Sequence, residues 1–170
     1  MSANPKVAVV MGSDSDFDKL KGCIKRLKEF KIEPCVRVIS AHRTPEAAEE
    51  FSRTAADNGI EVIIAAAGKA AHLAGVLAAS ATVPVIGVPI KSSTMDGLDS
   101  LLSTVQMPSG IPVATVAIDG GENAGILAAQ ILSLRYDYLK DMIKDFKREM
   151  AEKVMEKDKK IQDMIKDLEV

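Results

Sequence analysis

A short segment of the sequence places a hydroxyl, an imidazole and a guanidinium almost side by side. The residues are Ser40, His42 and Arg43, followed by Thr44 and Pro45. An imidazole titrates at a pKa of about 6.5, so it can give and take a proton near neutral pH. A guanidinium binds an anion without titrating. The segment is therefore suited to proton transfer on an anionic substrate.

The same segment lies between a strand pattern and a helix pattern. A β-branched run ends at Ile39, after which Thr44 is predicted to be an N-cap, Pro45 to take the first helical position and Glu46 to be an acid in the first turn. In an open α/β sheet such a turn opens onto the crevice at the carboxyl ends of the strands, where ligands bind. We therefore predict a ligand site at this turn, with His42 as its proton-transfer residue.

Strand and helix patterns alternate along most of the chain. Apolar runs of strand length occupy residues 7–11, 33–39, 60–66, 85–88 and 113–118. Helical patterns follow them from residue 17 and at residues 45–58, 70–80, 96–107 and 123–133. This alternation predicts an α/β fold, a doubly wound parallel sheet with right-handed crossovers in the flavodoxin-like order 2-1-3-4-5. The helix at 70–80 is so poor in polar residues that we expect it to be buried against another subunit as well as its own sheet.

In that strand order the loops after the first three strands meet at one end of the sheet and should line one pocket. The first loop offers hydroxyls and backbone N–H groups at a helix start, which favours a phosphate, and the carboxylate of Asp16 can accept hydrogen bonds from sugar hydroxyls. A phosphorylated riboside would satisfy both. Equally, Ser13, Ser15 and Asp16 could simply cap a helix. The candidate pocket residues are Gly12, Ser13, Ser15, Asp16, Ser40, His42, Arg43, Gly68, Lys69, Ala70, His72 and Leu73.

Other residues and motifs have competing interpretations. A structural or subunit-contact role for His72 is as plausible as catalysis, because it is predicted just inside an alanine-rich helix. Gly68 and Lys69 resemble the end of a P-loop, but alanine follows where Ser or Thr is required. The alternating aspartates at 14, 16 and 18 lack the glycine and glutamate of a calcium loop. No His/Cys/Asp cluster has metal-ligand spacing, so no metal is expected.

Length, charge and cysteine usage narrow the class of protein. The 170 residues, 47% of them hydrophobic, suit one compact domain with an appended element, and a net charge of -2 disfavours nucleic acid or an anionic membrane as the main partner. Cys23 and Cys35 lack CxxC or Cys/His ligand spacing, so we expect both to be small buried hydrophobic residues in a reducing compartment. Neither a signal peptide nor an apolar run of roughly 18 residues is present. We expect a cytoplasmic protein.

From Tyr136 onward the composition changes to Lys, Asp and Glu with a thin apolar stripe. Ile143, Phe146, Met150 and Val154 recur at helical spacing. This predicts a C-terminal helical extension in one or two pieces. We therefore divide the chain into a nucleotide-binding catalytic domain, residues 1–135, and a helical tail, residues 136–170, that is expected to pack on neighbouring subunits.

Six blocks of sequence, in order, resemble the N5-carboxyaminoimidazole ribonucleotide mutase family of purine biosynthesis. They are residues 12–16, 40–45, 70–73, 84–89, 97–101 and 105–108. Because the turn reads His-Arg-Thr-Pro, the resemblance is to the bacterial mutase class rather than to the class that carboxylates aminoimidazole ribonucleotide directly with carbon dioxide. It covers about residues 7 to 133. It implies a three-layer fold, a homo-octamer, a ribonucleotide substrate, and no metal or other cofactor.

By position, the resemblance assigns proton transfer to His42 and substrate binding to Ser13, Asp16, Ser40 and Arg43. The implied reaction moves a carboxylate from an exocyclic nitrogen to a ring carbon of the same nucleotide. Two positions depart from the family, which commonly has glycine at Lys69 and proline at Ala74. Lys69 either adds a cation near the pocket or points outward.

Several rival functions fit parts of the sequence. Direct carboxylation with carbon dioxide would need much the same pocket. A flavodoxin-like module could bind FMN or a nucleotide without chemistry, although with no Trp and 4% aromatic residues it has little to stack on a flavin. Asp14 could be the nucleophile of an aspartyl phosphatase. The alanine-rich helices and charged tail could also belong to a purely structural assembly protein.

Overall fold

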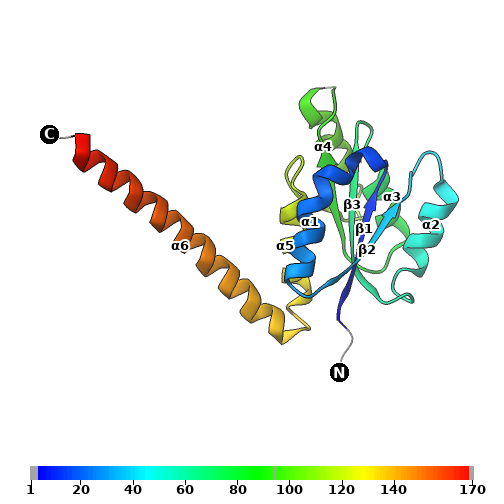
Figure 1. The fold of residues 1–170 in the computed structure, drawn as a ribbon. Coiled ribbons are helices and arrows are strands. Elements are labelled where there is room, and N and C mark those ends of the chain that lie inside the picture. The colour runs from blue at the N-terminus through cyan, green and yellow to red at the C-terminus, as the bar shows by residue number, and fades with distance from the viewer. Residues whose placement is uncertain (1–3, 94, 169–170) are drawn as a thin grey trace. The chain divides into compact units, whose positions relative to one another are not determined.

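A central parallel sheet organises the chain, for which the computed structural model describes residues 4–93 and 95–168 (Figure 1). The strands are β1 (Lys6–Met11), β2 (Glu33–Val38), β3 (Ile60–Gly68), β4 (Val85–Ile90) and β5 (Ala114–Thr115). They lie in the order β2-β1-β3-β4-β5, and every pair is parallel. The predicted flavodoxin-like order is confirmed.

Helices cover both faces of this sheet, which makes three layers. They are α1 (Phe17–Glu29), α2 (Pro45–Thr54), α3 (Leu73–Ser80), α4 (Leu98–Val105) and α5 (Gly121–Leu132), with short 3-10 turns η1 (Asp14–Asp16) and η2 (Met95–Gly97). On one face α1 packs against α5, and on the other α2 packs against α3, which in turn contacts α4. Gly121 permits the first contact, because a Cβ at this position would lie 2.7 Å from the carbonyl oxygen of Lys19.

The strand register places the carboxyl ends of β1, β2, β3 and β4, and the loops that follow them, at the same edge of the sheet. Met11 at the end of β1 is paired with Val38 of β2 on one side and with Ala66 of β3 on the other. Gly68, at the end of β3, is paired with Ile90 at the end of β4. Residues 7–11 and 62–66 are buried, so the strands that carry these loops form the rigid interior of the unit.

Some predicted element bounds were wrong. The strand predicted at 113–118 is only the two-residue β5. Beyond it, Val116 N–H donates to the carbonyl of Gly87 and Asp119 N–H donates to the carbonyl of Pro89. These donors are three residues apart while the acceptors are two apart, so the regular parallel ladder does not continue. The helix predicted at 45–58 ends at Thr54 and is followed by turns that close at Gly59, whose φ is +76°.

The alanine-rich helix also departs from its prediction. It begins at Leu73 rather than at residue 70, because Lys69 has a φ of 57° and His72 N–H donates to the carbonyl of Ala70, a turn that no helix can include. Within the single chain Leu73, Ala74 and Leu77 are buried, whereas Ala79 is exposed. The helix therefore has a partly open face, and its predicted burial against another subunit stays a prediction.

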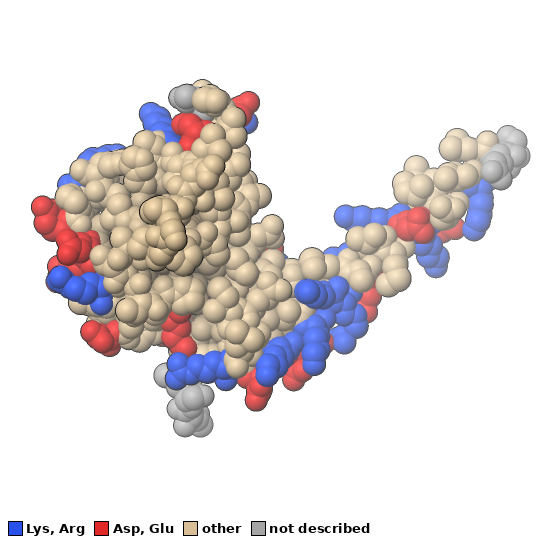
Figure 2. Space-filling view, turned by 180° about the vertical axis from the view of Figure 1, so that it is seen from behind, with Lys and Arg blue, Asp and Glu red and all other residues tan. Residues whose placement is uncertain are grey.

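The outer surface includes a broad face with few charged side chains (Figure 2). On α4, Leu98, Leu102 and Val105 are among the exposed large apolar residues. Cys23 is buried as expected, which raises the pKa of its thiol to about 12. Cys35 is partly exposed, so the expectation that it is buried was wrong; neither cysteine forms a disulfide. Within the part of the chain that the structure describes, no helix is both long and apolar enough to cross a membrane.

A second unit follows, with the boundary between Leu132 and Ser133. It is dominated by α6 (Asp137–Leu168), a single helix of 32 residues rather than two pieces. Exposed ion pairs three residues apart run along it, such as Lys140 with Asp137 and Arg148 with Asp145. Its apolar stripe includes Met150, Val154, Ile161 and Ile165, all of them exposed.

Candidate active site

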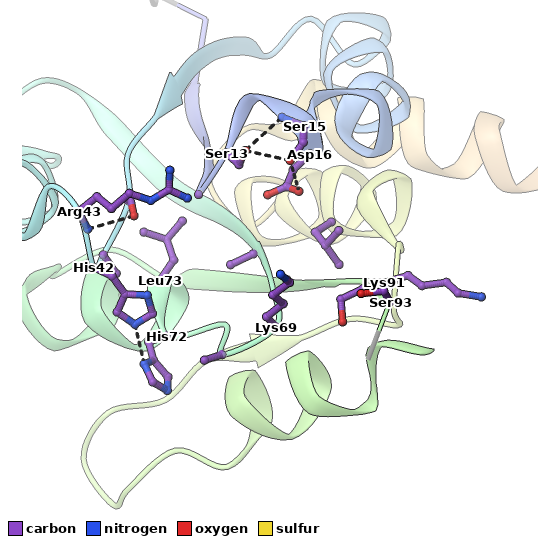
Figure 3. Close-up of a pocket in the computed structure, with 18 residues that line it drawn as sticks. Ser13, Ser15, Asp16, His42, Arg43, Lys69, His72, Leu73, Lys91 and Ser93 are labelled. Carbon is purple, nitrogen blue, oxygen red and sulfur yellow. Dashed lines mark hydrogen bonds between the residues drawn. The ribbon is translucent and has the colours of Figure 1, made fainter. Parts of the chain in front are cut away.

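A pocket of about 360 Å³ lies at the carboxyl ends of the strands, lined by the loops that follow β1, β2, β3 and β4 (Figure 3). All of the candidate residues predicted from the sequence line it: Gly12, Ser13, Ser15, Asp16, Ser40, His42, Arg43, Gly68, Lys69, Ala70, His72 and Leu73. The predicted convergence of three loops is confirmed. The roles of these residues toward a substrate remain predictions.

The loop after β1 is held in place by its own backbone and by serine hydroxyls. Gly12 N–H donates to the carbonyl of Ala66, which ties the loop to β3. The Oγ of Ser13 accepts hydrogen bonds from the N–H of Ser15 at 3.3 Å and from its Oγ at 2.9 Å, so Ser13 caps η1. Both serines also face the pocket, which makes their hydroxyls available to a ligand without a change of fold.

Asp16 is the acidic group of this loop. Partial burial raises the pKa of its carboxyl, and the charges of Asp119 and Asp14 raise it further, whereas hydrogen bonds from Ser15 and Ser13 act in the opposite direction. A carboxylate in such a place repels phosphate but accepts hydrogen bonds from hydroxyl groups. Asp16 is therefore suited to bind the sugar of a ribonucleotide.

The loop after β2 is a tight turn closed by Ser40 and Thr44. Ile39 N–H donates to Met11, and Thr44 N–H donates to the carbonyl of Ser40 at 2.9 Å. The Thr44 hydroxyl bonds the N–H and the carbonyl of Ser40, each at 3.0 Å, and makes no capping bond to α2. Thr44 is the N-cap residue, as predicted, and Pro45 and Glu46 begin the helix as expected, but the Thr44 side chain does not make the capping bond. The hydroxyl holds the turn that presents the imidazole and guanidinium.

The two histidines of the chain contact each other at the pocket. Nε2 of His42 lies 2.9 Å from Nδ1 of His72, and the rings meet edge to face with centroids 5.0 Å apart. One of the two nitrogens donates and the other accepts, according to the tautomer. His72 stands before α3 rather than inside it. This places its imidazole beside His42 at the pocket, and its role toward a substrate stays a prediction.

The loop after β3 adds a cation. A side chain at Gly68 would be crowded, because a Cβ there would lie 3.3 Å from the carbonyl oxygen of Ile90. Lys69 then adopts a left-handed φ of 57°, and its side chain points into the pocket (Figure 3). Neither Lys69 nor Arg43 forms an ion pair with any residue that the structure describes. The pocket thus carries two cationic groups whose partners would have to come from a ligand.

The loop after β4 completes the pocket and was missed in the sequence analysis. Ile90, Lys91, Ser92 and Ser93 line it. The adjacency of β4 and β3 in the predicted order was a signal that could have found them. Lys91 N–H donates to the carboxylate of Asp119 at 2.9 Å, and its ammonium pairs with Asp96 at 3.1 Å.

Asp119 organises this end of the site. Burial alone would raise the pKa of its carboxyl, but hydrogen bonds from Lys19 and from the Lys91 backbone outweigh burial and lower the pKa. Asp119 is thus an ionised anchor for the loop after β4. By contrast, Asp14 is exposed and does not line the pocket. Among residues 4–93 and 95–168, no group of three or more His, Cys, Asp and Glu side chains is arranged to hold a metal ion.

Comparison with known proteins gives consistent matches over nearly the whole chain. The family model described as AIR carboxylase matches residues 6–153. The N5-carboxyaminoimidazole ribonucleotide mutase of Pyrococcus abyssi is 58% identical over 146 residues, 86% of this chain and 84% of that protein. The mutase of the same name from Pyrococcus horikoshii is 52% identical over 163 residues, 96% of this chain and 92% of that protein. A crystal structure of Treponema denticola PurE aligns with a TM-score of 0.84 and 32% identity, covering 92% of this chain and 98% of that one.

Proposed function

Because the chain belongs to the AIR carboxylase family, we propose that it is the isomerase of purine biosynthesis that converts N5-carboxyaminoimidazole ribonucleotide into 4-carboxy-5-aminoimidazole ribonucleotide. The observation that carries this proposal is the pocket, which gathers an imidazole pair, two cations with no ion-pair partner among the described residues, a carboxylate and serine hydroxyls. The substrate is a riboside with a phosphate and a carboxylate, so each kind of group in the pocket has a counterpart.

The binding roles follow from the chemistry of each side chain. Arg43, with the hydroxyls of Ser13 and Ser40, binds the phosphate through charge-assisted hydrogen bonds. Asp16 accepts hydrogen bonds from the ribose hydroxyls. Backbone at Gly68 and Ala70 and the side chain of Leu73 border the base, where a planar ring needs a close and partly apolar wall.

His42 is the general acid and base of the reaction. Protonated His42 gives its proton to the exocyclic nitrogen as the N–C bond of the carbamate breaks, which releases carbon dioxide and the uncarboxylated nucleotide. The ring carbon then attacks carbon dioxide to form the new C–C bond. Neutral His42 removes the proton from that carbon, which restores the aromatic ring and returns His42 to its starting state.

His72 positions the proton-transfer group. Its Nδ1 lies at hydrogen-bond distance from Nε2 of His42. In this arrangement the other ring nitrogen of His42, Nδ1, is left to exchange the proton with the nucleotide. The pair therefore fixes the ring orientation of an exposed side chain that would otherwise sample several rotamers.

Retention of carbon dioxide decides whether the reaction is an isomerisation. Carbon dioxide that escapes is lost to solvent, whereas carbon dioxide held beside the ring is recaptured locally. The loop after β4 lines the pocket on the side away from His42, and the side chain of Lys69 points into the space between them (Figure 3). A bound nucleotide would fill much of the remaining volume and so keep the carbon dioxide near the ring.

The test is a spectroscopic assay of the purified protein with the N5-carboxylated nucleotide, in the absence of ATP and in the presence of EDTA. We expect rapid formation of the C4-carboxylated isomer, and much slower formation from the uncarboxylated nucleotide with bicarbonate. Faster turnover of the second pair would identify direct carboxylation instead. Conversion of neither pair would refute the proposal.

The remaining rivals make separate predictions. An FMN-binding module would copurify with a yellow ligand and interconvert no nucleotide. A phosphatase that uses Asp14 loses its structural support, because Asp14 lies outside the pocket.

We also propose that the active form is a cytoplasmic homo-octamer. The exposed apolar residues of α4 and the partly open face of α3 support assembly, because such surfaces are usually covered in oligomers. Light scattering coupled to size-exclusion chromatography measures the mass directly.

A further inference from the structure

Among the residues that the structure describes, Lys69 alone combines three features. It lines the pocket, its backbone is left-handed with a φ of 57°, and its ammonium has no ion-pair partner among the described residues. A non-glycine residue in this conformation costs on the order of 1 kcal/mol. Glycine would remove that cost. Lys69 therefore keeps a strained backbone at a position where its side chain adds a positive charge to the pocket.

We propose that Lys69 binds the carboxylate of the carboxylated nucleotide and thereby makes the pocket discriminate carboxylated from uncarboxylated nucleotides. This inference rests on the proposed function. The substrate carries two anionic groups, a phosphate and a carboxylate. The pocket offers two cations, Arg43 and Lys69, that form no ion pair within the part of the chain that the structure describes. Arg43 has the planar fork that suits phosphate, so the flexible ammonium is left for the second anion.

The fold places Lys69 on the loop that reaches the reacting atoms. The loop after β3 also carries His72, whose imidazole contacts His42. The carboxyl group must migrate beside His42, so a cation on this loop is close to its path. A Cβ at Gly68, the last residue of β3, would lie only 3.3 Å from the carbonyl oxygen of Ile90, and Lys69, the first residue after β3, lines the pocket.

Lys69 does not serve to neutralise the charge of Asp16. The groups that shift the pKa of Asp16 are its own burial, the two neighbouring serines and the charges of Asp119 and Asp14; Lys69 is not among them. Lys91 differs as well, because its ammonium is already paired with Asp96. The charge of Lys69 is therefore available to a ligand.

The experiment compares the affinities of two nucleotides by calorimetry. The C4-carboxylated product and the uncarboxylated nucleotide share the phosphate and differ in the carboxylate. In Lys69→Met and Lys69→Gly we expect the dissociation constant of the carboxylated nucleotide to rise about tenfold and that of the uncarboxylated nucleotide to change less than twofold. Lys69→Arg should retain most of the discrimination.

Lys31→Gly is the matched control. Lys31 has the same φ of 57° but lies in the turn between α1 and β2, outside the pocket. Both glycine variants should unfold at the same or a slightly higher temperature than the wild type, because each relieves a left-handed backbone. Only the variant at position 69 should lose affinity.

The other outcomes overturn the inference in distinguishable ways. An equal loss for both nucleotides would assign Lys69 to the phosphate, and no loss for either would mean that its ammonium stays in solvent. In either case the wild type would still interconvert the carboxylated isomers, so the proposed function would stand. A wild type that binds neither nucleotide would overturn both.

Discussion

The charged side chains of the pocket and those of α6 are held in opposite ways. Along α6, acids and bases pair with each other one turn apart, as Lys144 does with Asp141 at 3.4 Å and Lys166 with Asp163 at 3.3 Å. In the pocket, Arg43 and Lys69 have no such partner among the described residues, and burial raises the pKa of Asp16. Several charges of the helix are paired within it, whereas these two cations of the pocket are open to a ligand.

This difference separates charges that pair within one helix from charges that are left open to a ligand. Exposed ion pairs contribute little to stability, so α6 could exchange them freely. In the pocket, the carboxylate of Asp16 is partly desolvated and the backbone of Lys69 is strained, and both features oppose folding. Substitutions in the pocket should therefore cost function and spare stability, and substitutions in α6 should change neither by much.

The largest effect is expected at the proton-transfer group. His42→Asn removes the imidazole but keeps a side chain that can hydrogen bond to His72. We expect kcat to fall about a thousandfold, since general acid–base catalysis contributes roughly 10²- to 10⁴-fold. Thermal unfolding and nucleotide affinity should stay close to wild type, because His42 is exposed and outside the core. Turnover within a factor of ten of wild type would remove His42 from the mechanism.

A smaller effect is expected from loss of Arg43, the residue proposed to bind the phosphate. Arg43→Ala deletes a guanidinium that has no partner in the described protein, so little stability should be lost. We expect KM to rise roughly 10- to 100-fold with kcat reduced far less, because the lost bond acts in the ground state and the transition state alike. Arg53→Ala on α2, whose exposed arginine pairs with Glu49, is the control and should leave KM unchanged. A fall in kcat at constant KM would contradict a purely binding role.

The position of this pocket could be predicted because it depends on strand order. Alternating strand and helix patterns define the doubly wound sheet, and its order brings the loops after β1, β2 and β3 together. Polar residues directly after an apolar run, such as Ser13 and His42, are then assigned to the pocket by topology alone. No side-chain geometry is needed for that step.

Details that depend on tertiary contacts could not be predicted in the same way. The hydroxyl of Thr44 bonds back to Ser40 rather than to its helix, and the start of α3 is delayed by the left-handed turn at Lys69. The contact between His42 and His72 joins residues 30 positions apart through that same turn. Periodicity reports which face of an element is apolar, but not which turn conformation a loop adopts.

A still smaller effect is expected at Asp16, where function and stability should move in opposite directions. The pKa of the Asp16 carboxyl is raised in the folded state above its ordinary value of 3.8. At a pH above the raised pKa the ionised carboxylate therefore destabilises the fold. This destabilisation disappears as the pH falls through the raised pKa toward 3.8, where the carboxyl becomes protonated in both states. Asp16→Asn should therefore melt about 1–2 °C above wild type at pH 7, with the difference shrinking toward pH 4.

The same substitution should weaken nucleotide binding. An amide accepts a weaker hydrogen bond than a carboxylate, so we expect about a fivefold loss of affinity. Asp14→Asn changes an exposed neighbour outside the pocket and should leave affinity unchanged. A lower melting temperature for Asp16→Asn, with affinity intact, would mean that this carboxylate serves the fold.

The smallest effect is expected on α6, at Lys144. The side chains of the Lys144–Asp141 pair are 76% and 80% exposed, so solvent screens the pair and Lys144→Ala should change the free energy of unfolding by no more than about 0.5 kcal/mol. Alanine also has the higher helix propensity, which offsets part of any loss. KM and kcat of Lys144→Ala should both match the wild type when the variant is assayed in parallel with Arg43→Ala. A large loss of stability or affinity would show that this charge of α6 has a partner outside its own helix, and the contrast with the pocket would no longer hold.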